Sequence, residues 1–346
     1  MRLSEPWREP GNFVIAGRES IIVRTRPGRD SRRMMTNIDP EILAARGAQA
    51  EAHPAFDVTR LPIAEGRRLA NAAASFFNDD RPKMASIHDE AIGSAEQPVR
   101  VRVYRPANPR GHGAILYIHG GGWYACSVDT HDRLMRLLAE DSGLTVAGVD
   151  FRLAPEHPFP AALEDCIAAW DWLQGQSAES GIDPERVVVA GDSAGGNLAL
   201  ALTLWLRDER RRMPAGAAIL YGCLAPGIIT DTSTRFGQGG YGLTAERMEW
   251  YWRNYLGPAA DAPPSLAAPL YAELDGLPPI FIGIAEADTI ADESRMLLQR
   301  LQAVGVSAEL KVWEGAVHGF LQMTRDVALA RNATTDVARW AETATR

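Results

Sequence analysis

The segment Gly191–Gly196, which reads GDSAGG, constrains the structure of this chain more than any other. It fits the pattern Gly-x-Ser-x-Gly. The apolar, β-branched run Arg186–Ala190 before it is typical of a strand buried on both faces, and Asn197–Leu206 after it consists mainly of good helix formers. A serine at such a strand-to-helix turn is held with its hydroxyl above the sheet, and small neighbours permit the sharp bend. The segment therefore predicts that Ser193 is a nucleophile.

A second glycine-rich turn, His119–Trp123 (HGGGW), follows the apolar run Ala114–Ile118. A serine that attacks an acyl carbon creates an oxyanion, which backbone N–H groups stabilise when they are placed in advance. Glycines at the end of a strand can turn their amides toward that oxygen without side-chain obstruction. We therefore predict an oxyanion hole formed by the N–H groups of Gly121, Gly122 and Ala194. The histidine of this turn is expected to shape the loop through hydrogen bonds rather than to transfer protons.

A serine hydroxyl becomes a good nucleophile when a histidine takes its proton and a carboxylate orients that histidine. Where the serine lies in a strand-to-helix turn, the chain order is serine, acid, histidine. The sequence contains 7 histidines, and only His318 lies beyond Ser193. It follows the strand-like run Ala308–Trp313, so we expect it on a loop at the carboxyl ends of the strands.

The acid is expected just after the preceding strand-like run, Pro279–Ala285, where several carboxylates occur close together. Asp288 is the preferred candidate because it lies in the turn itself, before the next helical run begins. Glu286 is the second candidate. Asp292 and Glu293 are interpreted as carboxylates of the first helical turn, where they interact favourably with the helix dipole.

Strand-like and helical runs alternate along most of the chain. An antiparallel pair, Met84–Ile92 and Pro98–Tyr104, precedes them. The strand-like runs that follow are Ala114–Ile118, Thr145–Phe151, Arg186–Ala190, Gly216–Cys223, Pro279–Ala285 and Ala308–Trp313. The helical runs are Thr130–Asp141, Ala161–Gln174, Asn197–Arg210, Ala291–Ala303 and Val327–Thr343. Such alternation predicts an α/β fold whose mostly parallel sheet is covered by helices on both faces.

Two regions depart from the alternation. Residues 1–80 show no strand pattern and contain two helical stretches, Asp39–Glu51 and Thr59–Phe77. Residues 225–260 form an insertion rich in glycine and aromatic residues, which we expect to be a loop plus one helix that opens at Thr244, a plausible N-cap. Long insertions at strand ends usually carry function, and this one is interpreted as a lid packed on the N-terminal helices.

The insertion also contains Gly237–Gly242, which matches the dinucleotide-binding pattern Gly-x-Gly-x-x-Gly. That site requires a strand directly before the glycines and a helix that opens within them. The preceding residues Asp231–Arg235 are polar and typical of a turn. We therefore interpret the glycines as a lid loop and expect no dinucleotide cofactor.

The composition narrows the classes of partner. The chain has 346 residues and a net charge of −8, which disfavours binding to nucleic acid or to an anionic membrane. Met1–Pro10 lacks the apolar core of a signal peptide, and no apolar stretch is long enough to span a bilayer. The cysteines are odd in number and lack metal-ligand spacing, which predicts a cytoplasmic protein with no metal site; they are Cys126, Cys166 and Cys223.

With these residues placed, the chain resembles the hormone-sensitive-lipase-like family of α/β-hydrolases, in the subgroup with GDSAG at the serine turn. The resemblance extends from about residue 95 to the C-terminus. The matching segments, in chain order, are His119–Trp123, Asp150–Ala162, Gly191–Gly196, Tyr241–Thr244, the turn at Asp288 and the pair His318-Gly319. Several separated motifs in the right order make the resemblance specific.

The resemblance implies an α/β-hydrolase fold with a mostly parallel sheet of eight strands and a helical cap. The cap would comprise residues 1–80 and an insertion at about 225–260, and the catalytic domain residues 81–346. The implied activity is hydrolysis of short- to medium-chain carboxylic esters by Ser193, Asp288 and His318, with neither metal nor organic cofactor. The Arg152–Pro160 segment is structural in this family.

Some questions stay open at this point. An amide or N-acetyl deacetylase, or a lactonase, would use the same residues on another small-molecule substrate. A ligand receptor on a disabled hydrolase fold would lack the base, but His318 is present. Trp123–Ser127 is bulkier than in many relatives and is expected to narrow the pocket. Six aromatic residues either line an apolar pocket or anchor the lid; they are Trp123, Tyr124, Phe236, Tyr241, Trp250 and Trp252. A homodimer is compatible with the sequence, and no stable membrane association is expected.

Overall fold

The structure is a computed structural model, and it describes residues 21–22, 37–94, 96–176 and 181–346. Its centre is a sheet of eight strands in the order β10-β9-β7-β6-β4-β5-β3-β2. The strands are β2 (Ser86–Ser94), β3 (Gln97–Arg105), β4 (Ala114–Ile118), β5 (Thr145–Asp150), β6 (Val187–Asp192), β7 (Gly216–Leu220), β9 (Ile280–Ala287) and β10 (Ala308–Val317). Strand β3 is antiparallel to both β2 and β5, and all other neighbours are parallel. The predicted fold class is confirmed.

The central strands are apolar because both of their faces are covered. Every residue of β4 and of β6 is buried, as expected for parallel strands between two layers of helices. The two strands pair in parallel with Ile118 opposite Gly191. The turns that follow them, which contain the HGGG and GDSAG motifs, therefore leave the sheet side by side at its carboxyl edge.

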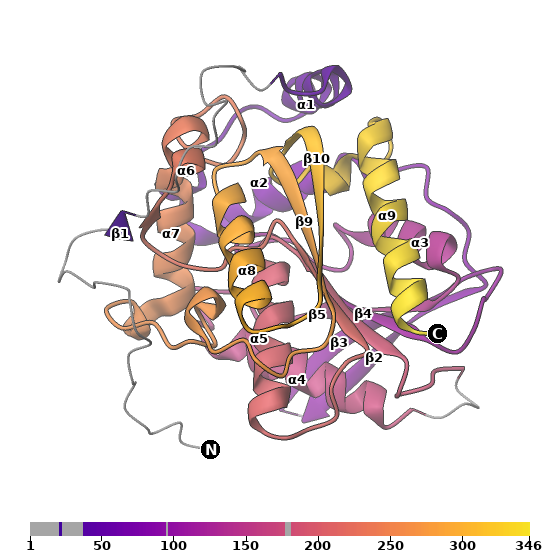
Figure 1. The fold of residues 1–346 in the computed structure, drawn as a ribbon. Helices are drawn as coiled ribbons and strands as arrows, with labels where there is room; N and C mark the ends of the chain where they lie inside the picture. Colours follow the sequence, from indigo (N-terminus) through magenta and orange to yellow (C-terminus); the bar gives the residue numbers. More distant parts are fainter. Residues whose placement is uncertain (1–20, 23–36, 95, 177–180) are drawn as a thin grey trace.

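Helices cover the two faces of the sheet (Figure 1). On one face lie α3 (Asp132–Ser142) and α9 (Ala328–Ala344), and on the other lie α4 (Ala161–Gln174), α5 (Ala194–Asp208) and α8 (Ala291–Ala303). Each layer encloses its own apolar cluster, one that includes Leu134 and Val337 and one that includes Leu198 and Leu297. The sheet holds these two cores apart, and the carboxyl ends of its strands remain free to form a site.

The N-terminal helices partly follow the sequence expectation. Helix α1 (Pro40–Ala52) lies where the first helical stretch was predicted, and Asp39 caps it by accepting a hydrogen bond from the N–H of Glu41 at 2.8 Å. The second predicted helix, Thr59–Phe77, is wrong at its start. A short 3-10 turn, Val58–Arg60, comes first, and α2 (Ile63–Ser75) begins only after Pro62. Proline fixes its own φ and disfavours a helical conformation in the residue before it, so the helix starts beyond it.

The insertion contains more structure than predicted. Helix α7 (Ala245–Leu256) opens as expected after Thr244, whose hydroxyl accepts from the N–H of Arg247 at 3.1 Å. A short strand, β8 (Ile228–Ile229), and a short helix, α6 (Asp231–Phe236), precede it. The prediction of a turn at Asp231–Arg235 is therefore wrong, because a capping box between Thr230 and Ser233 starts a helix in this polar segment. Strand β8 pairs with the two-residue strand β1 (Ile21–Ile22), which the sequence did not indicate.

No helix within residues 37–94, 96–176 and 181–346 is long and apolar enough to cross a bilayer. The prediction that Met1–Pro10 is not a signal peptide concerns residues outside the described ranges.

Candidate active site

Ser193 occupies the sharp turn between β6 and α5, with a backbone φ of 55° that is uncommon for a residue other than glycine. Two glycines make the turn possible. A Cβ atom on Gly195 would overlap the carbonyl oxygen of Ile118 in β4, and one on Gly191 would lie 2.8 Å from the same oxygen. The motif glycines are thus required by the close approach of the two strand ends, and the strained serine is held by the packing around it.

The structure brings Ser193, His318 and Asp288 together from three separate parts of the chain. The Ser193 Oγ lies 2.7 Å from Nε2 of His318, and Nδ1 of His318 lies 2.7 Å from Oδ2 of Asp288. The second carboxylate oxygen of Asp288 accepts a hydrogen bond from the N–H of Ile290 at 3.1 Å, which fixes the orientation of the carboxylate. Asp288 is buried, whereas the serine and the histidine both line an open cavity.

The other three carboxylates near this turn have different partners. Glu286 accepts from the N–H of Gly315 at 2.9 Å and so holds the end of β10. Asp292 accepts from the N–H of Thr232 at 3.0 Å and forms an ion pair with Arg295. Neither is in the hydrogen-bond chain that reaches Ser193, so the preference for Asp288 over Glu286 agrees with the geometry.

Glu293 is buried at the start of α8, a position the sequence analysis treated only as a first helical turn. Its Oε2 accepts hydrogen bonds from the N–H of Leu224 at 2.6 Å and of Ala225 at 3.0 Å. Burial raises the pKa of Glu293 to about 8, although these two bonds favour the charged form. The carboxyl group therefore ties α8 to the segment after β7 that contains Cys223.

The HGGG loop lies against the serine turn. Gly121 and Gly122 have φ values of 123° and 64° and line the same cavity as Ser193. A Cβ atom on Gly122 would lie 2.6 Å from the ring of Tyr251, so a larger residue would not fit. No described residue accepts a hydrogen bond from the N–H of Gly121 or Gly122. Ala194, the third predicted donor, is buried as the first residue of α5. The amides of the two glycines are therefore available to a ligand.

Asp192, next to the serine, connects the two loops. Its Oδ1 accepts from the N–H of Gly120 at 3.0 Å and from the hydroxyl of Tyr117 at 2.8 Å, and lies 3.6 Å from Nε2 of His131. Burial by itself would raise the pKa of Asp192, but the proximity of His131 and these hydrogen bonds keep it below its usual value. The buried carboxylate thus fixes the HGGG loop relative to the serine turn.

His119 is also buried, and its ring stacks on Phe151 at a centroid distance of 4.4 Å. Its Nδ1 lies 2.7 Å from the carbonyl oxygen of Gly120. Burial lowers the pKa of His119 to about 4, so the imidazole is neutral at physiological pH. This environment agrees with the expectation that it shapes the loop.

Ser193 opens into a cavity of about 510 Å³ at the carboxyl ends of the strands. Its other walls come from loops and from the helices above the sheet. The sequence analysis interpreted this region as a lid but did not predict which of its residues line the cavity. They include Arg46 and Phe56 from the N-terminal region, Cys223 after β7, and Leu243, Arg247, Met248 and Tyr251 around α7. The spacing of 247, 248 and 251 is that of one helix face, which is the signal that could have identified them.

The six aromatic residues that were considered as pocket-lining are absent from this wall. Trp252 is buried and packs against Trp123 at a centroid distance of 4.6 Å, so it anchors α7 on the core. Trp250 packs edge-on against Tyr124 at 4.9 Å. Because Trp123–Ser127 lies behind the glycine loop and contributes no lining residue, the expected narrowing of the pocket by this segment is not observed.

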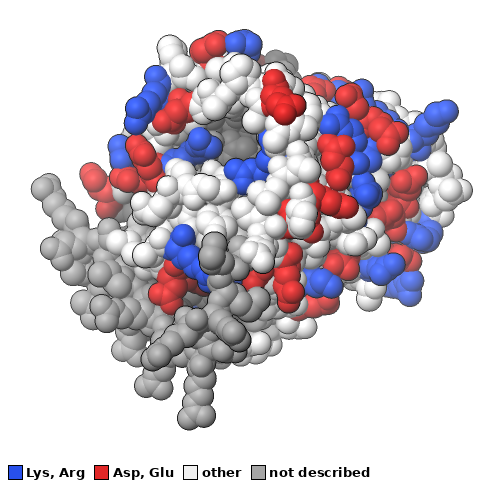
Figure 2. Space-filling model, turned by 90° about the horizontal axis from the view of Figure 1, so that it is seen from above, with Lys and Arg blue, Asp and Glu red and all other residues white. Residues whose placement is uncertain are grey.

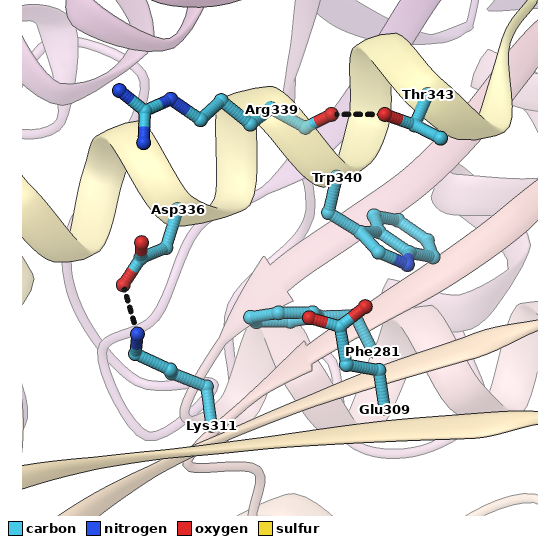
Figure 3. Close-up of a pocket in the computed structure, with 7 residues that line it drawn as sticks. All are labelled: Phe281, Glu309, Lys311, Asp336, Arg339, Trp340 and Thr343. Atoms are coloured by element: carbon cyan, nitrogen blue, oxygen red, sulfur yellow. Dashed lines mark hydrogen bonds and ion pairs between the residues drawn. The ribbon is translucent and has the colours of Figure 1, made fainter.

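Another pocket, of about 290 Å³, lies between β10 and α9, away from Ser193. The rings of Phe281 and Trp340 form one side, and Lys311 pairs with Asp336 at 3.2 Å (Figure 3). It contains no residue that the sequence analysis associated with chemistry. Within the described ranges, no group of three His, Cys, Asp or Glu side chains could hold a metal ion.

Comparisons with known proteins agree with this geometry. Residues 115–322 match the model of a family described as having the alpha/beta hydrolase fold. An acetyl esterase of Salmonella typhi is 37% identical over 271 residues, which cover 77% of this chain and 82% of that protein.

Solved structures give the same result. A hyperthermophilic esterase from the archaeon Pyrobaculum calidifontis has a TM-score of 0.83 and 31% identity, covering 89% of this chain and 98% of that one. EstE1, a thermophilic carboxylesterase from a metagenomic library, has a TM-score of 0.80 and 33% identity, covering 84% and 100%. This chain belongs to the α/β-hydrolase fold family, in the hormone-sensitive-lipase-like branch that its motifs indicated.

Proposed function

We propose that this protein is a serine carboxylesterase that cleaves short- to medium-chain acyl esters through an acyl-enzyme on Ser193. The observation that supports this most is the continuous hydrogen-bond chain from the Ser193 hydroxyl through His318 to the buried Asp288, with the hydroxyl at the wall of a cavity. The names of its relatives, acetyl esterase and carboxylesterase, support ester hydrolysis and a short acyl group.

In the proposed first half-reaction, the Ser193 Oγ attacks the ester carbonyl carbon while Nε2 of His318 takes the hydroxyl proton. Asp288 holds the histidine in the tautomer that accepts at Nε2 and stabilises the imidazolium that forms. The tetrahedral oxyanion is stabilised by the N–H groups of Gly121, Gly122 and Ala194, each worth about 3 kcal/mol. The bond to the alcohol oxygen then breaks, and His318 protonates the leaving alcohol.

In the second half-reaction, water attacks the acyl-enzyme and gives a proton to His318. The bond between the acyl carbon and the Ser193 Oγ breaks, the histidine returns the proton to the serine, and the carboxylic acid leaves. The cavity wall nearest the serine is suited to a small apolar acyl group. Cys223 Sγ lies 3.6 Å from the Ser193 Oγ and 3.9 Å from Met248 Sδ, so little space separates these groups.

We further propose that residues 1–80 and about 225–260 form a cap on a catalytic domain that comprises the rest of residues 81–346. Helices α1 and α7 supply cavity residues from above the sheet, which supports this division. A small-molecule ester is the proposed substrate. The cytoplasmic location and the homodimer stay predictions.

Replacement of the serine provides the test. Ser193→Ala is expected to lower kcat on p-nitrophenyl acetate by about 10⁴-fold or more, because the nucleophile is removed. Ser294→Ala is the matched control, since Ser294 is also buried but lies in α8, and its hydroxyl has no hydrogen-bond partner among the described residues. An aryl phosphonate should label Ser193 in the intact protein, as read by mass spectrometry of the peptide. Near-normal turnover by Ser193→Ala would overturn the assignment.

A further inference from the structure

The cavity at Ser193 carries an unbalanced positive charge. Arg46 from α1 and Arg247 from α7 both line it, whereas the described wall includes a single carboxylate, Asp192. That carboxylate is buried and already accepts hydrogen bonds from Tyr117 and Gly120. Figure 2, seen from above, shows Lys and Arg side chains at the edge of a hollow. The excess is opposite in sign to the whole chain, whose net charge is −8.

Neither Arg46 nor Arg247 forms an ion pair with a described residue. Among the described residues, the guanidinium of Arg46 donates only to the carbonyl oxygen of Gly240, at 3.2 Å. The Nε of Arg247 is buried and has no hydrogen-bond partner in the part of the chain that the structure describes. Arg253, two turns further along α7, shows the ordinary arrangement, with Glu249 at 2.5 Å. The cavity arginines therefore keep unused donors.

The acidic group on which the charge of Arg247 acts, Asp57, does not supply the missing partner. The hydrogen bonds from Thr59 lower the pKa of Asp57, and the charge of Arg247 contributes to this shift. The Asp57 carboxylate, however, pairs with Arg60 at 3.2 Å and accepts from the Thr59 hydroxyl at 2.8 Å. Burial lowers the pKa of Arg46, because its guanidinium is partly shielded from water. A guanidinium stays charged in proteins, and leaving it desolvated without a partner costs free energy. Binding of an anion would remove that cost.

We infer that the cavity accepts esters that carry a second, anionic group, and that Arg46 and Arg247 bind this group. A carboxylate is the best match, because the guanidinium presents parallel N–H donors to two oxygens. Arg247 can reach a bound ester because it lines the same cavity as Ser193. The inference rests on the proposed function and names the class of substrate.

The test compares esters that differ only in this charge. One pair, 4-acetoxybenzoate and 4-acetoxybenzamide, places the carboxylate or its neutral amide on the alcohol side. The other pair, monophenyl adipate and its monoamide, places it on the acyl side. For each protein the measured quantity is the ratio of kcat/KM for the carboxylate to kcat/KM for the amide. Because both esters are assayed on one sample, the ratio does not depend on the fraction of folded enzyme.

We expect Arg46→Gln and Arg247→Gln each to lower this ratio about tenfold in at least one pair, consistent with loss of a charge-assisted hydrogen bond. Increasing the ionic strength should lower the ratio of the unmodified protein, because salt screens the attraction. Arg253→Gln removes the same charge from the exposed side of α7 and should leave both ratios unchanged. The pair that responds identifies which half of the ester carries the anion.

The inference would be overturned if the carboxylate-to-amide ratios of Arg46→Gln and Arg247→Gln lay within twofold of the Arg253→Gln ratios for both pairs of esters. It would also be overturned if the unmodified protein cleaved neither carboxylate ester. In that case, Ser193-dependent cleavage of the ester bond in the two neutral compounds would leave the proposed function intact. Loss of the proposed function itself would instead appear as turnover that survives Ser193→Ala.

Discussion

At the scale of single residues, the site depends on buried carboxylates that act through hydrogen bonds. Asp288 and Asp192 are both buried, but one orients His318 and the other fixes the HGGG loop. The proposed machinery therefore separates proton transfer from oxyanion binding, with a different aspartate supporting each. Substitution of either should affect turnover without removing the nucleophile.

Asp288→Asn should lower kcat on p-nitrophenyl acetate by about 10³- to 10⁴-fold with little change in KM. The amide can donate to Nδ1 of His318, which would place the proton on Nε2 and leave no acceptor for the serine hydroxyl. Steady-state kinetics and the rate of phosphonate labelling at Ser193 both report the loss. Asp336→Asn, which removes a carboxylate that pairs with Lys311 outside the site, is the control. Equal activity of the two variants would contradict the role of Asp288.

Sequence reasoning predicted a catalytic serine, acid and histidine because chain order and strand ends limit where such groups can meet. The 2.7 Å contacts from His318 to Ser193 and to Asp288 agree with that expectation. The same reasoning missed the burial of Glu293, whose partners Leu224 and Ala225 come from another strand end. A carboxylate in a first helical turn looks solvated in the sequence, and only the packing of α8 against the segment after β7 shows that it is not.

At the scale of elements, Glu293 makes the attachment of α8 depend on pH. Its folded-state pKa is about 8, above the ordinary value of 4.5. A carboxyl whose pKa is raised on folding favours the folded state fully below its unfolded pKa, and this contribution is lost as the pH rises through the folded pKa. The window in which stability falls because of this group is therefore about pH 4.5 to 8.

Chemical denaturation of the unmodified protein and of Glu293→Gln across that window tests this effect. The free energy of unfolding of the unmodified protein should fall from pH 5 to 8 more steeply than that of the variant, which keeps a neutral side chain of the same shape. Glu314→Gln, at an exposed position in β10, should reproduce the slope of the unmodified protein. Parallel curves for all three proteins would show that Glu293 does not titrate in this range.

The helices and strands of the structure show which elements local sequence patterns can predict. All eight strands of the sheet overlap runs that the sequence indicated. The central strands β4 and β6 are the clearest, because a strand buried on both faces is apolar over its length. Helix α6 was missed because its residues, Asp231–Phe236, are mostly polar and its start depends on a capping box rather than on an apolar stripe. The order of the strands in the sheet, and the helix faces that line the cavity, depend on long-range contacts that local patterns do not contain.

At the scale of the whole molecule, Arg67 of α2 is one of the residues that fasten the N-terminal helices to the remainder. Its guanidinium donates to the carbonyl oxygens of Tyr124 at 2.7 Å and Ala154 at 3.0 Å, and it pairs with Glu156 at 2.6 Å. The first of these carbonyls belongs to the segment just after the HGGG loop. Movement of α2 would therefore reach the cavity through this side chain, together with the bonds from the Tyr124 hydroxyl to the carbonyl oxygen of Ile63 and from the N–H of Cys126 to Asn71.

Arg67→Gln should loosen this attachment. Loss of the hydrogen bonds to two carbonyls, with the half-exposed ion pair adding little, is expected to lower the free energy of unfolding by about 2 kcal/mol. If α2 holds the cavity wall in place, KM for p-nitrophenyl acetate should rise more than kcat falls, and limited proteolysis should cleave residues 53–80 faster. Arg68→Gln on the same helix, which breaks only an exposed pair with Glu65, should change none of these. If both variants were cleaved at the same rate with the same KM, the other contacts of α2 would be sufficient to hold it, and the role assigned to Arg67 would be wrong.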